Sequence, residues 1–145
     1  MDSSQVKDEP FPAPSKRAMG TIDGVETEAT SIFFSDKIMV TLSQHGRLSQ
    51  WIQVPLSAPS PASIEMALPN ASLLPMAHLT PKTLFGGGGE ERESFGQLNA
   101  VQIGSLIARK NPEEQRTLLV GLGLLKAKLD REAFFDLIEL IQKVL

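Results

Sequence analysis

Apolar and polar residues alternate over short runs in the first third of the chain, a pattern typical of β-strands. The clearest run is "VETEATSIFF", Val25 to Phe34, in which two glutamates lie opposite the smaller side chains. Two-residue turn signals separate the runs, at Asp23-Gly24, Ser35-Asp36 and His45-Gly46. The pattern predicts four strands between residues 17 and 56, joined as an antiparallel meander.

The second half of the chain predicts two more strands and two helices. "KTLF" (82–85) has the character of a short strand, and residues 90–110 carry apolar side chains at helical spacing. "RTLLVGLGLL" (116–125) is apolar on both faces, which is typical of a central strand. Residues 130–145 form an amphipathic helix that Asp130 can cap. The predicted fold is α+β, a mostly antiparallel sheet of about six strands with two helices packed on one face.

Composition divides the chain into a tail, one domain and a long internal loop. The 145 residues suffice for one domain with a substantial core. Residues 1–15 are polar and rich in proline, and we expect a disordered tail there. Residues 16–145 are predicted to form a single domain. Residues 56–81, rich in Pro, Ser and Ala, interrupt this domain as a weakly ordered loop.

Charge and composition exclude several classes of function. The net charge of −3 supplies no general attraction for nucleic acid or anionic membranes. The chain has no cysteine, which excludes disulfides, thiolate catalysis and zinc held by cysteine. The first ten residues do not resemble a signal peptide, and "LLVGLGLL" is too short to span a bilayer. We expect a soluble intracellular protein without a nucleic-acid or membrane partner.

The glycine run in "KTLFGGGGEERES" suggests a phosphate-binding loop at first sight. A P-loop needs Lys and Ser or Thr directly after its last glycine, and a dinucleotide site needs GxGxxG spacing. Here Gly89 is followed by Glu90, Glu91 and Glu93, whose carboxylates would repel phosphate at the mouth of the helix. We therefore interpret residues 86–89 as a flexible joint and expect no nucleotide.

No catalytic or metal-binding constellation is visible elsewhere. His45 and His78 have no second or third ligand at metal spacing, and no serine lies in a nucleophile elbow. The basic residues Lys126, Lys128 and Arg131 are interpreted as a solvated connection, with an acidic partner surface as the alternative. The sequence predicts no enzyme activity, no cofactor and no metal.

The predicted fold leaves one face of the sheet open. We expect the side of the last strand that carries Gly121 and Gly123 to receive the helices, which turns its leucines outward. Trp51 either packs at an edge of the sheet or anchors an interface, since Trp is enriched in binding hot spots. The residues predicted to form a protein–protein interface on this open face are Met39, Trp51, Leu118, Val120 and Leu122.

Two blocks of the sequence resemble the proteasome assembly chaperone 3 family. The first block is "FFSDKIMVTLSQHGRLSQWIQV", in which the positions that match the family pattern are Phe34, Ser35, Ile38, Val40, Gln44 and Gly46. The second block is the order of "KTLFG", an amphipathic helix, "RTLLVGLGL" and a closing helix. The long loop, the glycine run and the tail depart from the family pattern.

This resemblance implies a non-enzymatic chaperone of the cytoplasm, with the nucleus as a further location. It implies a heterodimer with a proteasome assembly chaperone 4-like protein. The pair would bind alpha-type subunits of the 20S proteasome, notably subunit 5, and promote assembly of the alpha ring without ATP. The exposed turn from His45 to Arg47 is the candidate client contact. A non-enzymatic scaffold or trafficking adaptor is the alternative, and a small-ligand enzyme that uses the glycine loop is the third class considered.

Overall fold

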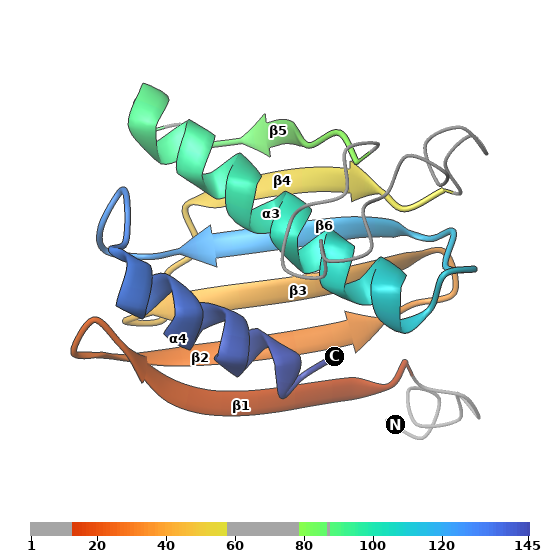
Figure 1. Ribbon diagram of the computed structural model, residues 1–145, viewed down its shortest axis with the longest axis horizontal. Coiled ribbons are helices and arrows are strands. Elements are labelled where there is room, and N and C mark those ends of the chain that lie inside the picture. The colour runs from red at the N-terminus through yellow and green to blue at the C-terminus, as the bar shows by residue number, and fades with distance from the viewer. Residues whose placement is uncertain (1–12, 58–78, 87) are drawn as a thin grey trace, which may run out of the picture.

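The computed structural model describes residues 13–57, 79–86 and 88–145 (Figure 1). Most of the predicted tail (1–15) and of the predicted loop (56–81) lies outside these ranges. The elements in chain order are β1 (Ser15–Ile22), β2 (Val25–Phe33), β3 (Lys37–Gln44), β4 (Gln50–Pro55), β5 (Lys82–Phe85), α3 (Glu90–Lys110), β6 (Thr117–Gly123) and α4 (Arg131–Gln142).

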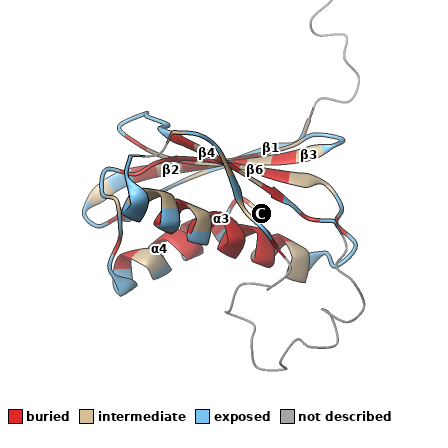
Figure 2. Cartoon of the chain, turned by 90° about the horizontal axis from the view of Figure 1, so that it is seen from above, coloured by how far each residue is buried: buried red, intermediate tan, exposed pale blue. Residues whose placement is uncertain are grey.

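The fold has two layers, a six-stranded sheet and a pair of helices. The strand order is β1-β2-β3-β6-β4-β5, in which β3 and β6 are parallel and every other neighbouring pair is antiparallel. Both helices lie on the same side of the sheet (Figure 2). The predicted fold class, α+β with a mostly antiparallel sheet and two helices on one face, is confirmed.

The predicted meander of four consecutive strands is wrong at its last step. β4 does not pair with β3, because β6 lies between them and pairs with both. The connection between β3 and β4 passes across the end of β6, where the Ser49 amide donates to the Leu122 carbonyl at 2.8 Å. β6 is the most continuously apolar strand, and a central position pairs both of its edges and shields it from water.

The core fills the space between the sheet and the helices. α3 packs mainly on β4, and α4 packs mainly on β1 (Figure 1). The two helices also meet through Phe95 and Phe134, whose rings contact edge to face at 6.2 Å. The side chains that build the core from the central strands are Ile38, Val40, Leu42, Ile52, Val54, Leu118, Val120 and Leu122, all 0–1% exposed.

Small residues let the helices approach the sheet and its flanks closely. A Cβ at Gly20 of β1 would lie 3.2 Å from a methyl group of Leu140 on α4. A Cβ at Gly104 of α3 would lie 3.3 Å from both Leu56 and Leu79, the buried residues that flank the undescribed segment 58–78. α4 begins as predicted, since the Asp130 carboxylate accepts a hydrogen bond from the Ala133 amide at 2.8 Å.

Candidate interaction surface

One face of the sheet is covered by no element among the residues that the structure describes (Figure 2). We call it the open face. Its centre follows from the strand registers, because Ile32 lies opposite Met39 and Met39 lies opposite Leu119. These three side chains are partly exposed. They point away from the helices, because each of them follows a buried residue along its strand. They form an apolar row across β2, β3 and β6.

Trp51 of β4 lies on the open face beside this row, because its partner Gly121 is two residues beyond Leu119 on β6. It lies opposite Gly121 of β6, and a Cβ added to Gly121 would be 2.9–3.1 Å from three atoms of the indole ring. The ring therefore lies over the glycine, as in cross-strand pairs where an aromatic side chain shields a glycine. Met39 and Trp51 both lie on the open face, where the sequence placed them.

The prediction that Leu118, Val120 and Leu122 lie on the open face is wrong. All three point toward the helices and are 0–1% exposed, so they belong to the core. The expectation assumed that a helix would pack on the glycine side of β6. Instead the indole ring of Trp51 occupies the space above Gly121, and the connection between β3 and β4 occupies the space above Gly123. The larger side chains of β6 are therefore the ones that fill the core beneath the helices.

Polar groups border the apolar centre of the open face. Thr30 and Thr41 share a hydrogen bond between their hydroxyl groups, and Arg17 forms an ion pair with Glu28 toward the β1 edge. Gln53 lies beyond Leu119 in the register of β4. An apolar centre with a polar rim is the usual anatomy of a protein–protein interface.

The edge strand β5 adds two exposed apolar side chains. Phe85 is 69% exposed and lies opposite Trp51, and Leu84 is 47% exposed. The sequence analysis did not select Ile32, Leu119, Leu84 or Phe85. Ile32 and Leu119 are identified by their register with Met39, and Phe85 by its register with Trp51. Leu84 has no partner in that register and is identified by its exposure alone. The pairings that place Leu119 and Phe85 join strands that are distant in sequence.

His45 and Arg47 lie apart from the apolar centre, at one end of the sheet. Both are exposed, and the turn between β3 and β4 is tight, with positive φ angles of 59° at His45 and 67° at Gly46. Arg47 forms an isolated bridge back to Gln44. The structure thus separates the two predicted surfaces, since the turn is at a sheet end and Met39 and Trp51 are on a sheet face.

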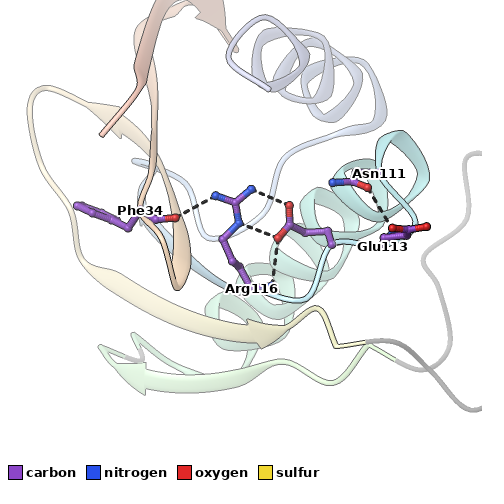
Figure 3. Close-up of polar contacts among 5 residues, drawn as sticks. Phe34, Asn111, Glu113 and Arg116 are labelled. Carbon is purple, nitrogen blue, oxygen red and sulfur yellow. Dashed lines mark hydrogen bonds and ion pairs between the residues drawn. The ribbon is translucent and has the colours of Figure 1, made fainter. Parts of the chain in front are cut away.

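A partly buried ion pair fixes the opposite end of the sheet (Figure 3). Arg116 donates from Nε and Nη2 to the two carboxylate oxygens of Glu114, at 2.7 and 2.8 Å, and from Nη1 to the Phe34 carbonyl at 2.9 Å. Its guanidinium also lies over the Phe33 ring. These contacts hold the segment between α3 and β6 against the turn between β2 and β3.

The pKa of Glu114 lies below its usual value of 4.5, chiefly because the Arg116 side chain donates hydrogen bonds to its carboxylate. Burial acts in the opposite direction but is the smaller effect. The pKa of Arg116 is raised by the same hydrogen bonds, so both partners are held in their charged forms. The pair is a structural clamp rather than a reactive site.

Within the described ranges no group of His, Asp or Glu side chains has the arrangement needed to hold a metal ion. None of the described helices is long and apolar enough to cross a membrane.

Comparisons with known proteins give a similarity in sequence and a similarity in structure. The sequence is 33% identical over 99 residues to an uncharacterized protein of Schizosaccharomyces pombe, and the match covers 66% of each chain, just under two thirds. No model of a known protein family matches the sequence.

The fold resembles the crystal structure of a novel chaperone complex for yeast 20S proteasome assembly. The TM-score is 0.60, and the similarity covers 89% of this chain and 96% of that chain at 15% sequence identity. At this identity the similarity establishes a shared fold. The protein therefore shares an α+β fold in which two helices cover one face of a single sheet, and no described element covers the apolar centre of the other face.

Proposed function

We propose that this protein is a non-enzymatic chaperone that promotes assembly of the 20S proteasome alpha ring. It acts as a heterodimer with a similarly folded, proteasome assembly chaperone 4-like partner, and the pair binds alpha-type subunits, with subunit 5 as the first candidate. The open face binds the partner, and the turn from His45 to Arg47 contacts the client. The protein works in the cytoplasm, with the nucleus as a further location.

The observation that carries this proposal is the open face of a sheet whose fold matches a chaperone complex. Ile32, Met39 and Leu119 form an apolar row that the described part of the chain leaves uncovered. Monomeric proteins rarely expose contiguous apolar surface of this kind without a binding role. A flat sheet face fits a second sheet, because two sheets pack face to face about 10 Å apart.

The proposed mechanism is binding without chemistry. The heterodimer would shield one surface of an alpha subunit and hold neighbouring subunits in register, and later subunits would release it by competing for the same surface. This mechanism needs no nucleotide. It agrees with the Glu90, Glu91 and Glu93 carboxylates in the first turn of α3, which disfavour phosphate there.

Affinity purification from cells with stalled proteasome assembly tests the proposal. We expect mass spectrometry of the tagged chain to recover 20S alpha-type subunits together with a small partner of the same fold. The variant Met39→Lys, which places a charge at the centre of the open face, should lose the partner, because an unpaired charge is costly in an apolar interface. Leu98→Lys is the matched control, because Leu98 is 45% exposed on α3, away from the open face.

Recovery of vesicle or signalling components in place of proteasome subunits would overturn the chaperone function and favour the adaptor alternative. Equal loss of the partner with Leu98→Lys would contradict the assignment of the interface to the open face. Circular dichroism of both variants shows whether they remain folded.

A further inference from the structure

A pocket lies where three segments distant in sequence meet at one end of the sheet. The segments are the turn between β3 and β4, the start of α3 and the end of β6 (Figure 1). The pocket has a volume of about 280 Å³ and is open to solvent. Its lining includes Arg47 and Ser49 from the first segment, Gly88 and Arg92 from the second, and Gly123 to Leu125 from the third.

Glycines allow the three segments to approach closely. A Cβ at Gly86 would lie 1.8 Å from the Ser49 carbonyl oxygen, and a Cβ at Gly123 would lie 1.5 Å from the Arg47 carbonyl oxygen. Gly86 also has a φ of 77°, which favours glycine. The glycine run is therefore packed against the β3–β4 turn at Gly86, and at this point it is more than the slack joint that the sequence suggested.

Hydrogen bonds from buried side chains fix the pocket walls. The Gln50 amide, 4% exposed, donates to the Arg92 carbonyl at 3.1 Å. The Gln44 side-chain oxygen, 2% exposed, accepts from the Leu125 amide at 2.8 Å. Two buried glutamines thus attach the first turn of α3 and the end of β6 to the sheet. A pocket built this way is preorganised, which reduces the entropic cost of binding.

The pocket presents positively charged donors. Arg92 uses Nη1 and Nη2 to donate to the carbonyls of Leu124 and Leu125, at 2.9 and 3.2 Å, which leaves other N–H groups of its guanidinium available. The guanidinium of Arg47 takes part in no hydrogen bond or ion pair with the described residues. No carboxylate is among the residues that line the pocket. Two arginines thus line one hollow, and guanidinium groups are suited to bind an anion.

The charges around the pocket limit which anion fits. Glu90, Glu91 and Glu93 lie in the first turn of α3, and they oppose the charge of Arg92. Beyond Leu125, the Nζ of Lys126 forms an ion pair with a carboxylate oxygen of Asp23, at 2.5 Å. The surrounding field is therefore mixed, which favours a singly charged carboxylate over a doubly charged phosphate.

We propose that this pocket binds a carboxylate group of a protein segment, with Arg47 and Arg92 as its ligands. The source is an acidic side chain or the free carboxyl terminus of a bound chain. The proposal deepens the client contact assigned to the turn from His45 to Arg47. It rests on the proposed function only for the identity of the client, because the chemistry of the pocket belongs to this chain alone.

Titration of the full chain by NMR tests the pocket directly. Three short peptides supply the carboxylate sources: a capped peptide with two central Glu residues, the same peptide with Gln, and the Gln peptide with a free carboxyl terminus. Inorganic phosphate is the fourth probe. We expect one of the two carboxylate-bearing peptides to shift the Nε–H signals of Arg47 and Arg92 and the amides of Gly88 and Gly123. The capped Gln peptide should cause no shift.

Arg47→Gln should weaken peptide binding about tenfold, the loss expected for one charge-assisted hydrogen bond. Lys143→Gln is the matched control, since it makes the same charge change on an exposed residue at the C-terminal end of α4, away from the pocket. Equal weakening by both variants would overturn the proposal. It would also be overturned if neither carboxylate-bearing peptide caused larger shifts than the capped Gln peptide. Phosphate binding as tight as that of the peptide would also contradict it.

The peptide titration uses the purified chain alone, so it stands apart from the purification experiment. Peptide binding without recovered proteasome subunits would support the carboxylate-binding pocket but contradict the proposed identity of the client. Recovery of proteasome subunits without peptide binding would support the chaperone function but contradict the proposal that the pocket binds a carboxylate.

Discussion

At the scale of single residues, Gly121 and Trp51 act as one unit. Because Gly121 has no side chain, the indole ring of Trp51 can lie over it, and the ring shields the glycine backbone. The sequence left two interpretations open for Trp51, packing at an edge of the sheet and anchoring an interface. Trp51 packs within the sheet rather than at its edge, since β4 lies between β6 and β5, and the interface anchor stays a prediction. One side of the ring stabilises the sheet, and the partly exposed ring surface remains available to a partner.

A second residue of interest is Glu114, and a variant of it tests the ion pair with Arg116 at the other end of the sheet. Glu114→Gln should lower the free energy of unfolding at pH 7 by about 1–3 kcal/mol, because a buried charge-assisted pair is broken. Urea unfolding monitored by circular dichroism measures this change.

The pH dependence of that difference follows from the lowered pKa of Glu114. A lowered folded-state pKa gives stability that is present above the unfolded value of about 4.5 and is lost as pH falls through the folded value. Wild type and Glu114→Gln should therefore converge in stability below that window. A constant difference between pH 7 and pH 3 would show that the ion pair contributes nothing through its charge.

At the scale of elements, the sequence predicted which segments form strands and helices better than it predicted their neighbours. Alternation and helical spacing are local signals, so α3, α4 and every strand were predicted near their observed positions. The insertion of β6 between β3 and β4 depends on pairing between residues about 60 to 80 apart, which no local pattern encodes. A strand with leucines on one side and glycines on the other has two possible orientations, and alternation cannot choose between them.

Two neighbouring leucines of β6 test the corrected orientation. Leu118 is fully buried under the helices, whereas Leu119 is partly exposed on the open face. Leu118→Ala should lower the free energy of unfolding by about 2–5 kcal/mol, the cost typical of a cavity in a core. Leu119→Ala should cost less than about 1 kcal/mol but weaken partner binding about tenfold or more.

Chemical unfolding and partner titration of the same two variants separate these effects. If Leu119→Ala were the more destabilising variant, and Leu118→Ala the one that weakens binding, the open face would have been assigned to the wrong side of β6.

At the scale of the whole molecule, the two proposed binding surfaces occupy different places. The open face is the broad side of the sheet opposite the helices (Figure 2). The pocket is lined by segments that meet at one end of the sheet, and its lining includes Arg47 and Arg92. Figure 1 shows where these segments meet. A partner on the open face would therefore leave the pocket accessible to a client. This separation is what an assembly factor needs if it binds a partner and a client at once.

The exposure of Trp51 tests the central claim most directly, because the chain contains one tryptophan and it lies on the open face. Labelling this chain alone with 5-fluorotryptophan gives a single fluorine signal. Its broadening by a soluble paramagnetic probe is then measured for the free chain and for the complex with the co-purified partner. We predict that the probe broadens the fluorine signal of the free chain and that the same signal is protected from broadening in the complex. A stable complex in which Trp51 remains as accessible as in the free chain would contradict the claim that the open face is the partner interface.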